Sequence, residues 1–252
     1  MTKVQSAILR QSSGQECKVQ NSKALESLFY QYTHLPIGGK EISCPYWRNR
    51  LSLAITGPFG GKGKPEQIVE ATESAAKKAA VNLNQMSEEE ILAFMKRKKI
   101  GVDCSGFVFW MLDALDRGRG GRGIADLIPR LPGTLAQRQV SADKLTGKNL
   151  SIPVKKIDEI RVGDTIRLHG GKHIAVVIKV VRDLGKVREI EYVHSSEKTA
   201  VPGVHSGLIK ITNLEGGLAD QEWEETLPNG DSYKQMLLSS QGDGLKRLKI
   251  WA

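Results

Sequence analysis

The strongest constraint on the fold is a change in the character of the chain near residue 160. Before this point the sequence favours helices, one of which begins at Pro65 and another at the capping box formed by Ser87 and Glu90. The predicted helices cover residues 21–32, 65–83 and 87–99. After it, five segments rich in β-branched or aromatic residues predict strands at 164–168, 173–181, 187–194, 207–212 and 245–251. Helices followed by strands predict an α+β domain with an antiparallel sheet.

A length of 252 residues allows one sizeable domain. We expect residues 1–100 to form a helical part that shapes a cleft within the same domain. Residues 101–252 would form the core with a C-terminal extension. With 40% apolar residues and no apolar run near the roughly 18 residues that cross a bilayer, the chain is expected to be soluble, without a transmembrane segment. The first residues lack the apolar stretch of a signal peptide, which predicts a cytoplasmic protein, or export by a route or signal not present in this chain.

Charge and cysteine content narrow the class of partner. The net charge of +9 favours an anionic partner, but the basic residues are scattered and have no aromatic residues among them, so a dedicated nucleic-acid surface is not expected. Cys17, Cys44 and Cys104 are too few and too scattered for a disulfide framework, and no CxxC pair suggests zinc. The glycine-rich segment 57–65 lacks the spacing of a phosphate loop and predicts a flexible loop before a helix.

The segment GVDCSGFVFWMLDAL, residues 101–115, carries the most informative chemistry. Cys104 stands where an apolar helical run begins. At a helix start a thiol meets unpaired N–H groups and the positive end of the helix dipole, which lower its pKa and favour the nucleophilic thiolate. An inert, buried cysteine remains the alternative on this segment alone.

A nucleophilic thiol requires a base, and two of the five histidines occupy related positions. His173 opens one predicted strand and His194 closes the next. If residues 182 and 187 pair across the short turn between these strands, Ala175 lies opposite His194, and both imidazoles point to one face of the hairpin. Taken singly, each histidine is equally explained as a polar residue at a strand end.

Two other histidines compete for these roles. His169 precedes the strand of His173, and His205 lies in a glycine-rich turn. We expect both side chains to be solvated.

The order of three motifs resembles the NlpC family of bacterial cell-wall cysteine endopeptidases, which belongs to the papain-like superfamily. The nucleophile motif is matched by DCSGFV at 103–108, the second motif by VGDTIRLHGGKHIAVVI at 162–178, and the third by VHSS at 193–196. The stretches LPGTLAQRQ at 131–139 and GVHSGLIKIT at 203–212 are similar to the segments that lie between and after these motifs. The resemblance covers roughly residues 101–212.

The resemblance implies a papain-like fold in which the Cys104 helix packs on a central antiparallel sheet. Cys104 would be the nucleophile, His173 its general base, and His194 the residue that orients His173. The backbone N–H of Cys104 would contribute to an oxyanion hole. The implied reaction is amide hydrolysis in peptidoglycan stem peptides, between a γ-linked D-glutamate and a diamino acid, through an acyl-enzyme and without a metal or cofactor.

Substrate-binding residues are less well defined by the resemblance. Family members place a tyrosine before the cysteine in a Tyr-x-x-Gly-Gly setting, and Tyr46 in CPYWRN is the nearest candidate, although it lacks those glycines. Asp103, Ser105 and Ser195, which flank the expected catalytic residues, are further candidates. The RGRGGRG loop at 117–123 and the tail at 213–252 have no counterpart in the family pattern.

Two other functions stay open. An amidase or acyltransferase on the same scaffold would need an apolar slot if it acted on lipid, whereas a stem-peptide enzyme needs charged groups for the substrate termini. A non-catalytic cell-wall-binding module is the alternative outside enzymes. The exact bond cleaved and the oligomeric state are open at this level.

Overall fold

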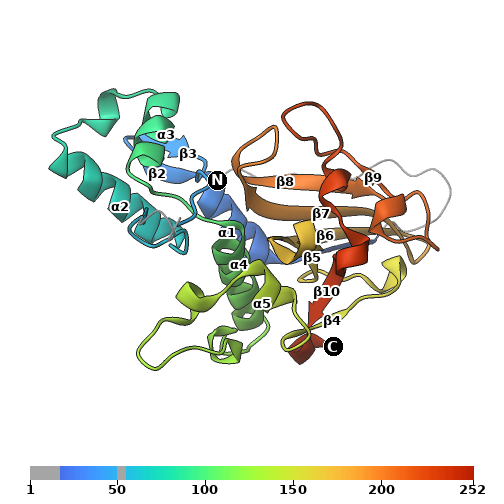
Figure 1. Cartoon of the computed structure of the whole chain (residues 1–252). Helices are drawn as coiled ribbons and strands as arrows, with labels where there is room; N and C mark the ends of the chain where they lie inside the picture. The colour runs from blue at the N-terminus through green and yellow to red at the C-terminus, as the bar shows by residue number, and fades with distance from the viewer. Residues whose placement is uncertain (1–17, 50–54) are drawn as a thin grey trace, which may run out of the picture.

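The computed structural model describes residues 18–49 and 55–252. Within these residues the chain forms an antiparallel sheet of eight strands in the order β4-β10-β5-β6-β7-β8-β9, with β1 paired to β6 (Figure 1). A separate hairpin is formed by β2 and β3. The mixed α+β class predicted from the sequence, with its antiparallel sheet, is confirmed.

Most expected elements form close to their predicted limits. The helices are α1 Lys23–Thr33, α2 Pro65–Lys78, α3 Glu88–Arg97, α4 Cys104–Gly118 and α5 Ala142–Thr146. The main-sheet strands are β1 Lys18–Asn21, β4 Ser151–Pro153, β5 Thr165–Leu168, β6 His173–Asp183, β7 Lys186–Ser196, β8 Gly203–Lys210, β9 Glu222–Trp223 and β10 Gly244–Leu248. The small hairpin consists of β2 Leu35–Ile37 and β3 Lys40–Ile42.

Local sequence signals set the helix starts. Pro65 is the first residue of α2, and the capping box before α3 forms as predicted: the Glu90 N–H donates to Ser87 Oγ at 3.2 Å, and the Ser87 N–H donates to Glu90 Oε2 at 2.7 Å. Each bond satisfies a backbone N–H that would otherwise lack a partner at the helix end.

The N-terminal part divides between two places. In Figure 1, α2, α3 and the β2–β3 hairpin lie together beside the sheet, whereas α1 packs against α4. Strand β1 joins the main sheet along the outer half of β6. The sequence predictions did not include β1 or the hairpin, because these strands are only three or four residues long.

The C-terminal segment belongs to the sheet and is not an appendage. Strand β10 lies between β4 and β5, where it pairs with both. Arg247 on β10 forms a buried ion pair with Asp164, with bonds of 2.7 and 2.8 Å. The last strand of the chain therefore closes one side of the sheet.

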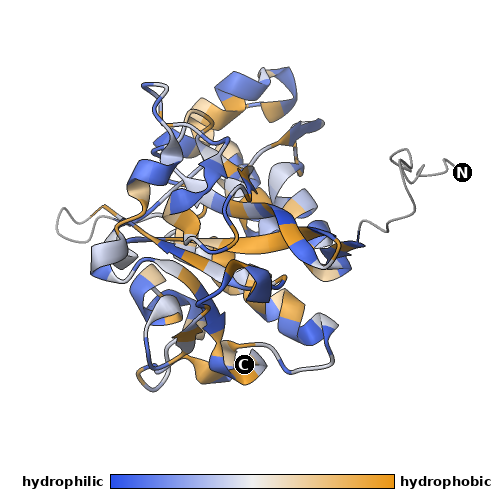
Figure 2. Ribbon diagram, turned by 90° about the vertical axis from the view of Figure 1, so that its right-hand side faces the viewer, coloured by the Kyte–Doolittle hydropathy of each residue, from blue (hydrophilic) through white to orange (hydrophobic). Residues whose placement is uncertain are grey.

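The core lies between α4 and the central strands. Residues 173–178 of β6 are buried, and α4 packs on β6 and β7. Figure 2 shows apolar residues concentrated along these central strands. A nearly continuous apolar run is the pattern of a strand covered on both faces. In the described parts of the chain, no helix is long and apolar enough to cross a membrane.

Candidate active site

Cys104 is the first residue of α4, as the sequence predicted. Asp103 caps the helix: its Oδ1 accepts from the Gly106 N–H at 2.7 Å and from Ser105 Oγ at 3.0 Å. Lys62 Nζ donates to Asp103 Oδ1 at 2.7 Å and to Ser105 Oγ at 2.6 Å. The cap therefore carries a buried cation next to the nucleophile, which sequence reasoning did not identify.

The glycine-rich segment before α2 packs directly on this cap. The Asp103 N–H donates to the Gly61 carbonyl at 2.9 Å, and Val102 forms β-bridges with Tyr46 and Lys62. A Cβ atom added to Gly106 would lie 2.3 Å from the Gly61 carbonyl oxygen. The segment expected to be a flexible loop therefore has a fixed role, because its backbone covers the nucleophile motif at a distance that requires glycine.

The environment of Cys104 does not lower its thiol pKa. Burial, followed by the charge of Asp103, raises it to about 12, although Lys62 and the backbone N–H groups of Ser105 and Ile174 act in the opposite direction. The expectation drawn from the helix start is therefore not met. Removal from water outweighs the helix N-terminus here, so the resting thiol is neutral.

The thiol lies next to the start of β6, since the Ile174 N–H that stabilises its ionised form directly follows His173. His173 Nε2 and His194 Nδ1 are 2.8 Å apart, and both rings are buried. The structure thus pairs His173 with His194 and places the thiol of Cys104 beside the start of the strand that carries His173. The catalytic roles of the three residues stay a prediction.

Two residues behind His194 were not assigned to the site from the sequence. His194 Nε2 lies 2.9 Å from Glu225 Oε1 and 2.9 Å from His205 Nε2, and His205 Nε2 lies 2.7 Å from Glu225 Oε1. Tyr192 donates its hydroxyl proton to Glu225 Oε2. His205 is the cross-strand partner of His194 because β8 begins at Gly203, before its predicted start. The expectation that His205 is solvated is therefore wrong.

The protonation states follow from these contacts. Burial alone would raise the pKa of Glu225, but hydrogen bonds from His194, His205 and Tyr192 lower it to about 2, so the carboxylate is ionised and can only accept. His194 must then carry its proton on Nε2. Burial lowers the pKa of His194, which is therefore neutral, and its Nδ1 accepts from the Nε2–H of His173. Burial, and then His194, lower the pKa of His173 well below 6.5. Its Nδ1 is thus left as a free base.

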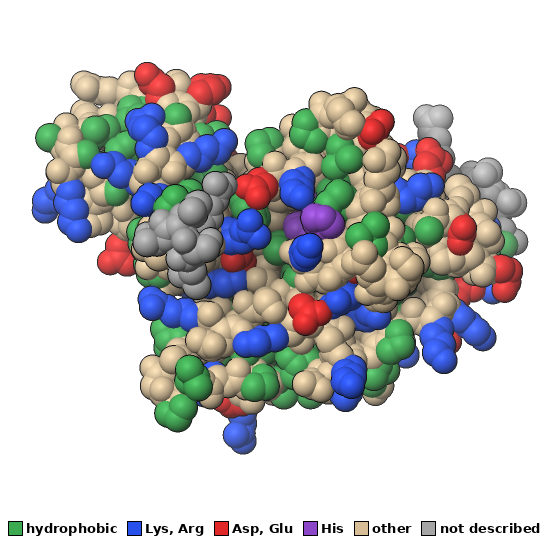
Figure 3. All heavy atoms as spheres, viewed as in Figure 1, with side chains coloured by type: hydrophobic (Ala, Val, Ile, Leu, Met, Phe, Trp, Pro, Cys, Tyr) green, Lys and Arg blue, Asp and Glu red, His purple; other side chains and the backbone are tan. Residues whose placement is uncertain are grey.

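A cavity of about 100 Å³ opens beside His173. Tyr46 and Tyr233 line it, and burial raises the pKa of both phenols, which remain neutral donors. Its charged lining residues are Arg48, Lys172, Lys198 and Glu197, and His169 also lines it. Figure 3 shows a histidine side chain in the middle of this face with basic side chains beside it. The mouth of the site is therefore polar and mainly basic.

The other candidate substrate residues occupy different positions. Tyr46 lines the cavity that holds His173, and Asp103 lines a second cavity of about 490 Å³ that shares Arg48. Ser195 is fully buried and donates to the Val102 carbonyl at 2.7 Å, and Ser105 donates to Asp103. These two hydroxyls support the segment around Cys104 from within, and their assignment as substrate-binding residues stays a prediction.

Among the described residues, the other histidine and cysteine candidates are not part of the hydrogen-bonded series. His169 is in the turn before β6 and lines the cavity, while the bond to His194 is made by His173. Cys44 is buried under the apolar core, which raises its thiol pKa. Cys17 lies outside the described residues.

Tyr233, Met236 and Glu225 all come from the tail that has no counterpart in the family pattern. The sequence around Glu225, QEWEET at 221–226, contains three glutamates and no feature that distinguishes Glu225 from its neighbours. Comparison of the chain with protein-family models, with curated proteins and with solved structures finds no match.

Proposed function

We propose that the protein is a papain-like cysteine hydrolase of the NlpC type, with Cys104, His173 and His194 as its catalytic residues. The observation that carries this proposal is the directed series of hydrogen bonds from Glu225 through His194 to His173, since His173 directly precedes Ile174, whose N–H contacts the helix-start thiol of Cys104. A buried cysteine with no chemical role has no need for such a series of hydrogen bonds. The same series argues against the alternative of a module that only binds the cell wall.

The neutral resting pair defines the first step. As Cys104 Sγ attacks the substrate carbonyl, its proton passes to His173 Nδ1, and the imidazolium is stabilised by His194 and, through it, by Glu225. His173 then gives this proton to the leaving amine, which leaves an acyl group on Cys104. Water transfers a proton to His173 and releases the acid. The thiol regains that proton.

The negative charge that develops on the substrate's carbonyl oxygen must be stabilised by hydrogen-bond donors close to that oxygen. The backbone N–H of Cys104, at the start of α4, is our candidate for the oxyanion hole, and the neutral phenol of Tyr46 is a second donor near the thiol. Positive charge at Lys62 adds a favourable field next to the nucleophile.

We propose peptidoglycan stem peptides as substrates, cleaved between a γ-linked D-glutamate and a diamino acid. The cavity supports this class over a lipid, because its mouth carries charged groups of both signs that can bind the carboxylates and amines of a stem peptide. An apolar slot for an acyl chain would favour the alternative amidase or acyltransferase.

The test is digestion of defined muropeptides, with Cys104→Ala as the control and the fragments identified by mass spectrometry. We expect cleavage within the stem peptide and a covalent enzyme–peptide adduct in the unaltered protein. Cleavage between the sugar and the peptide would indicate the amidase alternative. Activity retained by folded Cys104→Ala would contradict the assigned nucleophile.

A further inference from the structure

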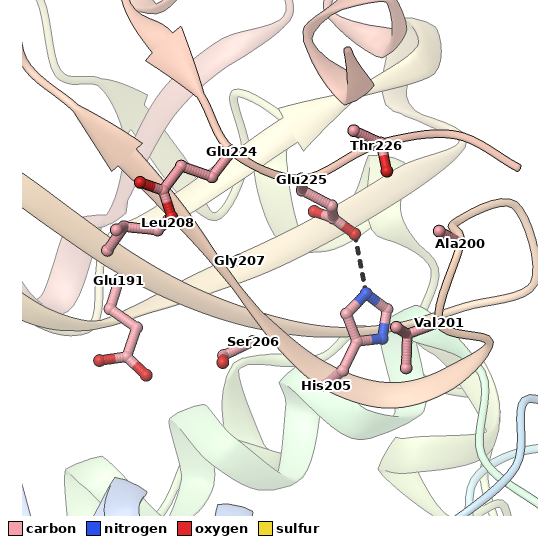
Figure 4. A pocket seen from close by; sticks show the side chains of 10 residues that line it. All are labelled: Glu191, Ala200, Val201, His205, Ser206, Gly207, Leu208, Glu224, Glu225 and Thr226. Atoms are coloured by element: carbon pink, nitrogen blue, oxygen red, sulfur yellow. Dashed lines mark hydrogen bonds and ion pairs between the residues drawn. The ribbon is translucent and has the colours of Figure 1, made fainter. Parts of the chain in front are cut away.

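Three metal-ligating atoms converge behind the catalytic pair. His194 Nε2, His205 Nε2 and Glu225 Oε1 lie 2.7–2.9 Å from one another. Figure 4 shows the Glu225 carboxylate in direct contact with the His205 ring, and both side chains line a pocket between β8 and the segment after β9. Two imidazole nitrogens and one carboxylate oxygen are a ligand set that suits zinc.

The outer partners of these groups hold the ligand atoms in place. His205 Nδ1 lies 3.0 Å from the Gly203 carbonyl, which can only accept, so the proton of a neutral His205 is on Nδ1 and its Nε2 lone pair points at Glu225. Tyr192 holds the other oxygen of the carboxylate. Metal-binding histidines almost always donate their second N–H to a carbonyl or carboxylate in this manner.

Without a metal, the three atoms are crowded together. His194 Nε2 and His205 Nε2 both contact Glu225 Oε1, at 2.9 and 2.7 Å, and the two nitrogens are only 2.9 Å apart. A cation among the three atoms would take the place of the hydrogens in these contacts.

The adjoining pocket provides access. It has a volume of about 390 Å³, and Glu191, Glu224 and Glu225 line it together with His205. Glu191 and Glu224 are paired with Lys179 and Lys210, so Glu225 is the carboxylate available to a cation. The pocket is separate from the cavity that contains His173.

We propose that His194, His205 and Glu225 form a binding site for one divalent transition-metal ion, with zinc as the best-fitting probe and a fourth position open to the pocket. Tetrahedral coordination with bonds of about 2.0–2.2 Å separates ligand atoms by roughly 3.3–3.5 Å. The three atoms must therefore move apart by about 0.5 Å. His205, which stands near the start of β8 with 12% of its side chain exposed, is the ligand with room to move.

Metal binding at this site switches off the base, a consequence that rests on the proposed function. With its Nε2 bound to the metal, a neutral His194 carries its proton on Nδ1 and donates to His173 Nε2. His173 then carries its own proton on Nδ1, the atom that must accept the thiol proton. The two rings keep two protons between them, in reversed positions. The metal is an inhibitor in this arrangement.

Binding is tested without reference to hydrolysis. A Cys104→Ala background removes the thiol, so that zinc has no second site at Cys104 and His173. Calorimetric titration of the chelator-stripped protein with zinc chloride should show one bound equivalent. His205→Gln and Glu225→Gln in this background should each bind at least about tenfold more weakly. His34→Gln, which changes a histidine at the end of α1, is the matched control and should bind like the background protein.

Absence of binding by the background protein, or equal binding by all the variants, would overturn the site. Because a substituted protein can fail to fold, nitrogen-15 spectra of the histidine rings in the unaltered sequence give a second measurement. Zinc should move the Nε2 signals of His194 and His205 and shift the His173 proton from Nε2 to Nδ1. Unchanged signals at saturating zinc would also refute the proposal.

The inhibitory effect is measured by the alkylation rate of Cys104 in the protein with its thiol intact. Zinc should slow alkylation, and His205→Gln should need at least about tenfold more zinc for the same effect. Equal sensitivity of the two proteins would place the metal at the thiol and overturn the inhibitory mechanism. If zinc binds as proposed but no amide substrate is ever cleaved, the metal site stands and the proposed hydrolase fails.

Discussion

Burial controls the ionisation of both reacting groups at the site. It raises the pKa of the Cys104 thiol and lowers the pKa of the His173 imidazole, so both groups are neutral near pH 7. A preformed thiolate–imidazolium pair would need the opposite shifts. In the proposed reaction the proton would therefore move during attack, since it is not already on the histidine.

This difference predicts the pH dependence of the reaction. His173 can accept a proton only when it is neutral, and its pKa lies well below 6.5, so kcat/KM should be fully retained at pH 6.5 and fall only at more acidic pH. The thiol has a pKa of about 12, so its ionisation does not change kcat/KM at lower pH. The measurement is a pH profile of kcat/KM. A loss of activity with an apparent pKa at or above 6.5 would contradict a neutral His173.

Glu225 sets the direction of the hydrogen bonds, so Glu225→Gln tests their role. An amide can donate to His194 Nε2, which would reverse the tautomers of both histidines. We predict that kcat falls at least about tenfold with little change in KM, since Glu225 lies outside the cavity that contains His173. Glu224→Gln, which changes the neighbouring carboxylate paired with Lys210, is the control and should leave kcat within about twofold. Similar rates for the two variants would remove Glu225 from the mechanism.

The β6–β7 hairpin shows how far sequence reasoning could go for a paired element. The predicted pairing of Arg182 with Val187 is present, but a bulge follows at once, and a second one at Ile178 reverses its effect. At the histidine end Val176 pairs with Val193, as the predicted register requires. Two compensating bulges thus leave His173 and His194 on one face. The alternation of apolar and polar residues predicts which face of a strand is buried. It does not reveal where a single-residue bulge interrupts the pairing.

Helix α4 offers a test in which propensity and packing have opposite effects. Alanine at position 106 should favour the helix by about 1 kcal/mol on propensity alone. Its Cβ would nevertheless meet the Gly61 carbonyl at 2.3 Å, and this contact is with backbone that cannot rotate away. Overpacking of this kind typically costs about 1–3 kcal/mol. We therefore predict that Gly106→Ala lowers the free energy of unfolding and displaces the cap around Cys104.

The control for this prediction is Gly118→Ala at the other end of α4, where the new Cβ would meet only the Ala24 side chain, at 3.0 Å. Urea unfolding of both variants measures the difference. If Gly106→Ala is as stable as the parent, the close contact between the glycine-rich segment and the nucleophile helix is not a constraint on the fold.

Across the whole molecule, the sequence predicted the class of fold and the proximity of His173 and His194 better than it predicted the assembly of the sheet. The C-terminal extension was expected as an addition to the core, yet β10 lies inside the sheet and the same tail supplies Glu225 and Tyr233. Which strand lies beside which is decided by contacts between distant parts of the chain. The local patterns of apolar residues in β5 and β10 do not contain that information.

The ion pair between Arg247 and Asp164 should hold this late strand in place, and it gives the last prediction. The two side chains are 10% and 2% exposed, and Arg247 also donates to the Glu159 carbonyl at 2.6 Å. Removing one partner leaves a charge in a site without water, which costs about 3–5 kcal/mol. Arg247→Met should therefore lower the free energy of unfolding by this amount in urea titrations followed by circular dichroism.

Two further variants separate the buried charge from the loss of side-chain packing. Arg247→Met combined with Asp164→Leu removes both charges and should recover part of the loss, because replacing a buried pair by apolar residues is often neutral. Lys186→Met breaks the ion pair with Asp158, in which the lysine side chain is 55% exposed, and should cost less than about 1 kcal/mol. If Arg247→Met costs no more than Lys186→Met, β10 is held by its backbone ladders and apolar contacts alone.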